Sequence, residues 1–299
     1  MKKLFLAFLV IPILILASCN NKTQNKSDSG KIKAVSTITI IDDVVKSIGG
    51  DKVETYSICG VGVDPHIYKA KPNDPRLISE SDIVFINGFG LEHWIEEMIR
   101  NAGGEKTVVT VTEGLTPMTD EKGYGDPDPH AWFDVENVKT YAKNVAKGLI
   151  SVDKENEKYY TDNLNNYLLQ LDSLNNWIKS RVQELPENQR VLITSHDAFR
   201  YFGRAYGFEV HGLQGISTEA KIQTDDVKKL VDFIKERQLK SVFIETSVNP
   251  KLLEQISSET GAKVGGVLYS DSIGNEGTED GTYIGAVKHN VNTIVNSLK

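Results

Sequence analysis

The chain has 299 residues, of which 25% are charged, and its formal net charge is −7 at pH 7. An acidic chain of this kind is a poor candidate for nucleic-acid binding, which requires clustered basic residues. Two cysteines are too few for a zinc–thiolate cluster, and Cys59 has no disulfide partner if Cys19 is modified as described below.

The first residues are typical of a bacterial export signal. Two lysines precede an apolar run over residues 4–17, which is too short to span a bilayer. The sequence Leu-Ala-Ser-Cys at residues 16–19 resembles a lipobox, in which cleavage precedes the cysteine and the cysteine is acylated. A buried N-terminal hairpin, the alternative, would leave the lysine pair unexplained. We therefore predict a lipoprotein signal peptide over residues 1–18, lipidation of Cys19, and a flexible tether over residues 19–30 that anchors the protein to a bacterial membrane, facing the periplasm or the cell exterior.

Residues 31–152 alternate short apolar runs with amphipathic segments, which indicates an N-terminal lobe with a parallel sheet flanked by helices. The expected strands are residues 33–39, 53–58, 83–87 and 107–111. The expected helices are residues 41–48, 75–79 and 91–101.

One long helix is predicted over residues 153–185. No glycine or proline interrupts this stretch, and apolar residues recur three and four positions apart. Asp153 is the expected N-cap, and Pro186 ends the helix. At a rise of about 1.5 Å per residue it would be roughly 48 Å long, more than one compact domain needs. We expect it to link two lobes; the alternative is a single oversized core helix.

Residues 186–299 repeat the alternation and predict a C-terminal lobe. The expected strands are residues 191–194, 208–212, 241–245 and 263–268. Helices are expected over residues 198–206, 224–236 and 250–260, with a last one at the end of the chain. The predicted fold is therefore α/β, with two lobes that each contain a parallel β-sheet flanked by helices and are joined by one long helix. Ligands bind such sheets at the carboxyl ends of the strands.

The candidate ligand-binding residues follow predicted strands. Asp-Pro-His occurs twice, at residues 64–66 and 128–130, and each proline fixes the backbone just before the histidine. Asp64 or Asp128 could hold a ring nitrogen of the neighbouring imidazole. In the second half, His196 and Asp271 each follow a strand directly.

Three imidazoles and one carboxylate suit zinc, and they suit manganese if the carboxylate binds through both oxygens. A single histidine after a strand is more often a hydrogen-bonded structural residue, so the repeated Asp-Pro-His carries most of the signal. We interpret His93, His211 and His289 as structural, because they lie within a predicted helix, an apolar strand and the last helix.

Four segments together resemble a known family. They are Asp-Pro-His-Ile-Tyr at residues 64–68, Asp-Pro-His-Ala-Trp-Phe-Asp at 128–134, Ser-His-Asp-Ala-Phe at 195–199 and Tyr-Ser-Asp-Ser at 269–272. They are similar to the four metal-ligand motifs of the zinc- and manganese-binding lipoproteins of ABC importers, the TroA-like (cluster A-I) solute-binding proteins. The resemblance covers the whole mature chain, and it includes Gly-Leu-Gln-Gly-Ile-Ser at residues 212–217.

The resemblance implies a monomeric solute-binding protein with no catalytic residue. One divalent transition metal (zinc or manganese, with iron as a third candidate) would be held between the lobes by His66, His130, His196 and Asp271 as cargo for an ABC permease. Zinc-dedicated members often carry a histidine-rich loop, whereas residues 115–128 contain no histidine. Many manganese-dedicated members have glutamate where this chain has His196. The metal therefore stays open between the two.

Two other classes of function compete with metal transport. A secreted zinc hydrolase would keep three protein ligands and one open position, with Asp197 or Glu245 as general base. A siderophore or corrinoid carrier would also contain a long linking helix, but it would leave the paired Asp-Pro-His motifs without a purpose.

Overall fold

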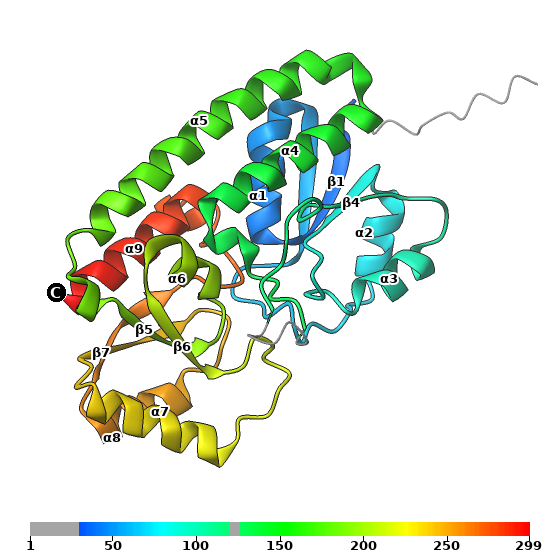
Figure 1. Cartoon of the computed structure of the whole chain (residues 1–299). Coiled ribbons are helices and arrows are strands. Elements are labelled where there is room, and N and C mark those ends of the chain that lie inside the picture. The colour runs from blue at the N-terminus through cyan, green and yellow to red at the C-terminus, as the bar shows by residue number, and fades with distance from the viewer. Residues whose placement is uncertain (1–29, 120–125) are drawn as a thin grey trace, which may run out of the picture.

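The computed structural model describes residues 30–119 and 126–299. The predicted signal peptide, Cys19 and nearly all of the predicted tether lie outside the described residues. Within the described ranges, no helix is both long and apolar enough to cross a membrane. The predicted fold class is confirmed, because two parallel sheets flanked by helices are joined by one long helix (Figure 1).

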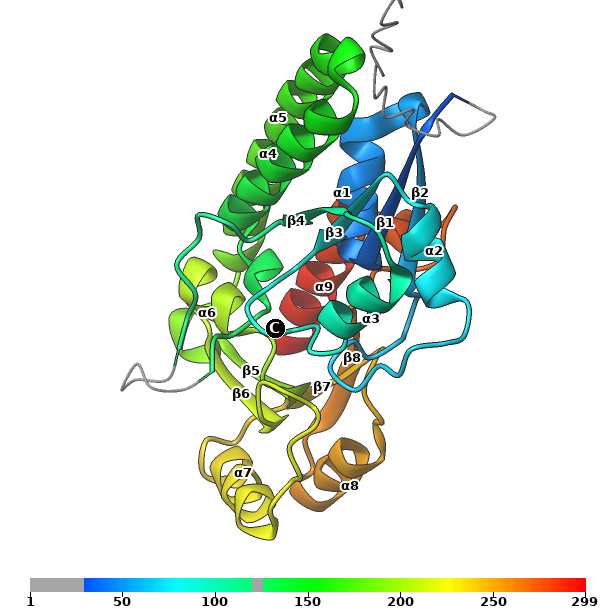
Figure 2. The same ribbon diagram turned by 90° about the vertical axis from the view of Figure 1, so that its right-hand side faces the viewer.

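The N-terminal lobe is built on four parallel strands in the order β2-β1-β3-β4. These are β1 (Ile32–Ile38), β2 (Val53–Cys59), β3 (Ile83–Ile86) and β4 (Thr107–Thr110). Its helices are α1 (Thr39–Gly49), α2 (Asp74–Glu80), α3 (Ile95–Ala102) and α4 (Val135–Val152). Helices α1 and α4 cover one face of the sheet, and α2 and α3 cover the other (Figure 2).

Helix α4 is absent from the sequence prediction. Asp134 is its N-cap and accepts a hydrogen bond from the backbone N–H of Glu136 at 3.0 Å. Its buried residues, which include Val138, Tyr141 and Val145, recur at helical spacing. Both signals are present in the sequence, so this helix was predictable and was missed.

The predicted linking helix is confirmed, but its ends differ from the prediction. Helix α5 spans Glu157–Val182 and has 26 residues, so its length is about 39 Å. A 3-10 turn, Lys154–Asn156, separates it from α4. Asp153 does not cap α5; its carboxylate accepts hydrogen bonds from the Tyr160 hydroxyl and the Asn156 side chain, both at 2.7 Å, and thereby fixes the turn between the helices.

The C-terminal lobe repeats the strand order of the first, as β6-β5-β7-β8. The strands are β5 (Val191–His196), β6 (Glu209–Gln214), β7 (Ser241–Glu245) and β8 (Lys263–Leu268). Helices α7 (Thr224–Glu236) and α8 (Lys251–Thr260) pack on one face through a small separate core, and α6 (Arg200–Tyr206) and α9 (Tyr283–Leu298) lie on the other. The remaining 3-10 turns are Gly50–Lys52, Ala131–Phe133, Glu187–Gln189 and Glu279–Gly281.

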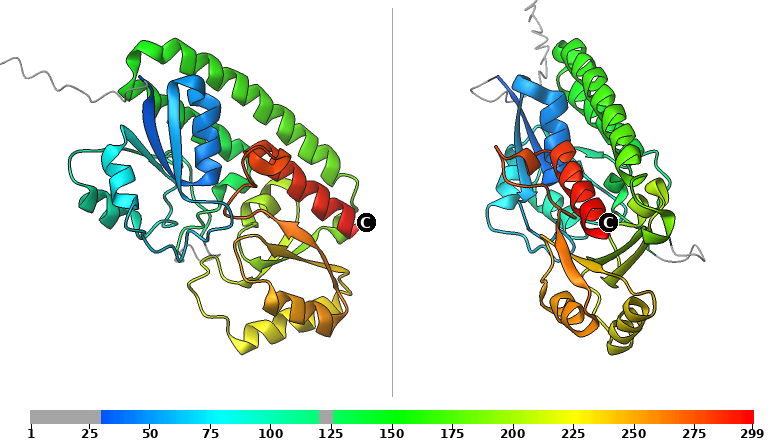
Figure 3. Two further views of the ribbon diagram at one scale, coloured as in Figure 1. Left: turned by 180° about the vertical axis from the view of Figure 1, so that it is seen from behind. Right: turned by 90° about the vertical axis from the view of Figure 1, so that its left-hand side faces the viewer.

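The two lobes share one hydrophobic core. This core extends from the N-terminal sheet through α4 and α5 to α6 and α9. Seen from behind, α5 runs along the N-terminal lobe and ends beside α9 (Figure 3). Polar contacts also cross between the lobes: the Trp132 indole donates to the Ser270 carbonyl at 3.0 Å, and the Tyr283 hydroxyl donates to the Trp132 carbonyl at 2.7 Å. The lobe interface is therefore packed and hydrogen-bonded.

Candidate metal centre

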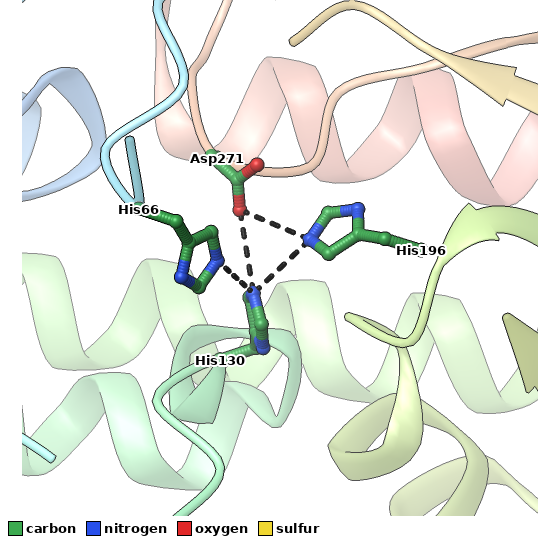
Figure 4. Close-up of side chains that lie close together, drawn as sticks. All are labelled: His66, His130, His196 and Asp271. Carbon is green, nitrogen blue, oxygen red and sulfur yellow. Dashed lines mark hydrogen bonds and ion pairs between the residues drawn. The ribbon is translucent and has the colours of Figure 1, made fainter. Parts of the chain in front are cut away.

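Four side chains from four separate segments meet between the lobes (Figure 4). His66 lies in the loop after β2, and His130 directly precedes the 3-10 turn Ala131–Phe133. His196 is the last residue of β5, and Asp271 lies in the loop after β8. Each lobe thus contributes two residues, near the carboxyl ends of its strands, as the general rule for parallel sheets predicts.

The facing atoms of these residues are close enough to share one ion. His130 Nε2 lies 3.2 Å from His66 Nε2 and 3.2 Å from His196 Nε2. Asp271 Oδ1 lies 3.4 Å from His130 Nε2 and 3.7 Å from His196 Nε2, and all four atoms are within 4.8 Å of one another. Ligands about 2.0–2.1 Å from a tetrahedral zinc ion are about 3.3 Å apart. The four distances given above are close to that spacing, and the other two pairs lie within 4.8 Å.

Carboxylates orient two of the three imidazoles. Asp128 Oδ1 is 2.8 Å from His130 Nδ1, and Glu245 Oε2 is 2.5 Å from His196 Nδ1. Glu245 also accepts a hydrogen bond from the His196 backbone N–H at 2.9 Å. A partner on Nδ1 leaves Nε2 directed at the shared centre and raises its basicity as a ligand.

The Asp-Pro-His motifs differ in how their aspartates are used. Asp128 contacts the ring of His130, which is one of the two alternatives that the sequence left open. Asp64 accepts the His66 backbone N–H at 2.9 Å and the hydroxyl of Thr218, from the other lobe, at 2.6 Å. Asp64 therefore fixes the loop of His66 and links it to the C-terminal lobe.

Burial and neighbouring charges set the proton affinity of the four residues. Burial lowers the pKa of His66 to about 3, so this imidazole is neutral. Burial alone would also lower the pKa values of His130 and His196, but the carboxylates facing them raise both above the ordinary value. Burial opposes ionisation of Asp271, yet His196 and His130 hold its pKa well below the usual range.

Asp271 presents one free oxygen to the centre. Its Oδ2 accepts hydrogen bonds from Ser247 Oγ at 2.7 Å and Ser270 Oγ at 3.3 Å. Its Oδ1 is buried and has no hydrogen-bond partner among the described residues. A buried carboxylate oxygen with no hydrogen bond, facing three imidazole nitrogens, suits a cation. This donor set therefore fits a divalent transition metal.

The other three histidines lie outside this cluster. His211 is paired with Glu209 at 2.9 Å on β6. His289, on α9, is 3.3 Å from Asp280. His93 is exposed and lies before α3, not within a helix as predicted.

Two residues beside the site were missed or assigned another role by the sequence analysis. Glu245 appeared there only as a candidate general base, but it is tied to His196. Ser247 was not considered. Because Glu245 ends a predicted strand, the rule that ligands gather at strand ends could have placed it near the site.

Comparisons with known proteins agree with this architecture. Residues 34–297 match the family model ZnuA, described as zinc-uptake complex component A, periplasmic. The chain is 38% identical to the zinc-binding protein TroA of Treponema pallidum, with 92% of each chain covered. It is 35% identical to the manganese-binding lipoprotein MntA of Halalkalibacterium halodurans, with 100% of this chain and 99% of the relative covered.

Solved structures give the same result. The periplasmic zinc-binding protein TroA from Treponema pallidum superposes with a TM-score of 0.86, covering 90% of this chain and 99% of that one. The Mn-bound periplasmic metal-binding protein from Candidatus Liberibacter asiaticus, 26% identical, gives a TM-score of 0.81, with 90% and 100% of the two chains covered. The chain therefore belongs to the ZnuA family, the substrate-binding proteins of metal ABC importers, which are not enzymes.

Proposed function

We propose that this protein captures one divalent transition metal between its lobes and delivers it to an ABC permease. The observation that carries the proposal is that His66, His130, His196 and Asp271, from both lobes, come within 4.8 Å of one another. In this proposal the lobes are residues 31–152 and 186–299. The protein acts as a monomer, anchored to a membrane through acylated Cys19 and facing the extracytoplasmic space.

The metal is bound through four protein donors, and zinc binds more tightly than manganese. Because Ser247 and Ser270 occupy Asp271 Oδ2, the carboxylate offers one oxygen to the metal. A four-coordinate site with three imidazoles suits zinc, whereas manganese favours more oxygen ligands. The relatives named above include both a zinc-binding and a manganese-binding protein, so the proposed preference for zinc rests on the donor geometry of this chain.

Binding exchanges protons for the metal. His66 is already neutral, whereas the raised pKa values of His130 and His196 favour protons that must leave before their Nε2 atoms can ligate. The ion then joins two donors of each lobe. Because the lobes share a core and several hydrogen bonds, we expect closure by small rotations rather than by a wide hinge.

The decisive experiment is a competitive titration of the metal-free protein with zinc, manganese and iron, beside an Asp271→Ala variant. A carrier with four protein donors should bind one ion per chain and lose at least tenfold in affinity with Asp271→Ala. Uptake of each metal by cells lacking the protein then identifies the cargo. Unchanged affinity in Asp271→Ala, or no metal binding by the unmodified chain, would refute the proposal. Structures with and without metal that differ by a large hinge rotation would refute the closure step.

A further inference from the structure

The β3–α3 loop, residues 87–94, contacts both Asp-Pro-His motifs in the same way. At one end, Asn87 Nδ2 donates to the Pro129 carbonyl at 2.9 Å. At the other end, Trp94 Nε1 donates to the Pro65 carbonyl at 2.9 Å. In each motif the acceptor belongs to the proline directly before the histidine. One short loop therefore holds the backbone at the entry to both His66 and His130.

The loop itself is held by a buried carboxylate. Glu92 is 5% exposed and accepts hydrogen bonds from the backbone N–H groups of Asn87 at 2.7 Å and Gly88 at 3.1 Å. It also accepts the Thr37 hydroxyl at 2.6 Å. The Tyr141 hydroxyl from α4 donates to Asn87 Oδ1 at 2.7 Å, which leaves the amide nitrogen of Asn87 facing Pro129. These contacts allow the loop little freedom.

The backbone of the loop is strained where it turns. Phe89 has φ 53°, and it lies between Gly88 and Gly90, which also have positive φ. A bulky residue in this region is unfavourable and persists only where surrounding contacts fix the conformation. Such strain is concentrated at functional sites, and here it lies between the two side chains that reach the proline carbonyls.

We propose that the β3–α3 loop is a positioning element that sets the separation of His66 and His130 for metal binding. The inference rests on the proposed function. His66 and His130 come from loops 64 residues apart in sequence, yet their Nε2 atoms are held 3.2 Å apart. Metal sites require their ligands within about 0.5 Å of the productive geometry. Asn87 and Trp94, attached to one rigid loop, fix both motifs relative to each other before the ion arrives.

The test replaces one donor and keeps the packing. Trp94→Phe removes the indole N–H but retains an aromatic ring beside Tyr68, whose ring centroid is 4.8 Å away. Trp177→Phe is the matched control, because Trp177 is also half-buried but lies on α5, which contributes no ligand. Zinc affinity, the visible absorption spectrum of bound cobalt(II), and thermal unfolding without metal are measured for both variants.

Trp94→Phe should weaken zinc binding about 3- to 10-fold, as expected for one lost hydrogen bond, and should alter the cobalt spectrum. Trp177→Phe should leave affinity and spectrum unchanged, even where unfolding temperatures fall equally. Asn87→Ser should act like Trp94→Phe. Wild-type affinity and spectrum in Trp94→Phe, or equal losses in both tryptophan variants, would overturn the inference while the proposed function stands. No metal binding by the unmodified chain would overturn both.

Discussion

Replacing Glu245 with glutamine should separate two effects of the carboxylate on metal binding. Glu245 is 3% exposed, lies 2.5 Å from His196 Nδ1 and accepts the His196 backbone N–H. Glutamine is nearly isosteric and places an amide beside Nδ1, but it carries no charge. His196 becomes a weaker donor to the metal, and loss of such a partner typically costs 10- to 100-fold in affinity, or about 1.4–2.8 kcal/mol.

The same substitution changes proton competition in the opposite sense. The Glu245 charge helps raise the pKa of His196 in the metal-free protein, so Glu245→Gln lowers that pKa. The full loss of affinity appears at a pH high enough that His196 is unprotonated in both proteins. As the pH falls, His196 becomes protonated in the wild type before it does so in the variant. The ratio of the two affinities should therefore shrink as the pH is lowered.

The assay is chelator competition with zinc at several pH values for wild type, Glu245→Gln and Glu209→Gln. Glu209 is a matched control because it also pairs with a histidine, His211 at 2.9 Å, on the neighbouring strand β6. Glu209→Gln should follow the wild-type curve. An affinity ratio for Glu245→Gln that is constant across pH would show that the carboxylate does not set the proton affinity of His196. Unchanged affinity at the highest pH would show that it does not support His196 as a ligand.

Three further results are expected. Zinc binding near neutral pH should release protons from His130 and His196, whose pKa values are raised, and none from His66, whose pKa is lowered to about 3. Calorimetry in buffers of different ionisation enthalpy measures the number released, and a value near zero or three would contradict this assignment. Burial raises the pKa of Asp43 to about 6, so the charge on Asp43 lowers the stability of the fold as the pH rises from about 4 to 6. Asp43→Asn should therefore raise the free energy of unfolding in urea by about 1–3 kcal/mol at pH 7.5 and leave it unchanged at pH 4. Thr218→Val removes the hydroxyl bonded to Asp64 across the lobes and should speed zinc release about tenfold in stopped-flow chelation; an unchanged rate would show that this contact does not retain the ion.

Much of the architecture follows from local patterns in the sequence. Alternating apolar runs and amphipathic segments fix the order of strands and helices, and the uninterrupted stretch before Pro186 predicts the linking helix. The four candidate ligands were predicted from the repeated Asp-Pro-His, from positions after strands and from the resemblance to a known family, and the structure brings them together. His66 and Asp271 are far apart in sequence, but ligands bind parallel sheets at the carboxyl ends of the strands, and this rule predicts without coordinates that the two residues lie near one site.

The partners of these residues depend on contacts that the sequence pattern does not contain. Glu245 reaches His196 because β7 lies beside β5, and strand order cannot be read from strand positions. The different roles of Asp64 and Asp128 likewise depend on which ring or loop lies within reach. The repeated tripeptide left open which aspartate holds a ring nitrogen. In the tertiary structure Asp128 contacts the His130 ring, and Asp64 accepts the Thr218 hydroxyl of the opposite lobe.

The buried carboxylates explain how this site can be stable both with and without its ion. Asp128, Glu245 and Asp271 place three buried carboxyl groups around the centre, and buried charge is costly without compensation. Arg200 lies 3.8 Å from Asp128, and the raised pKa values of His130 and His196 favour protons on the two imidazoles that face these carboxyl groups. A divalent ion that displaces such protons supplies positive charge in their place. Capture and release therefore exchange one source of positive charge for another at the same buried centre.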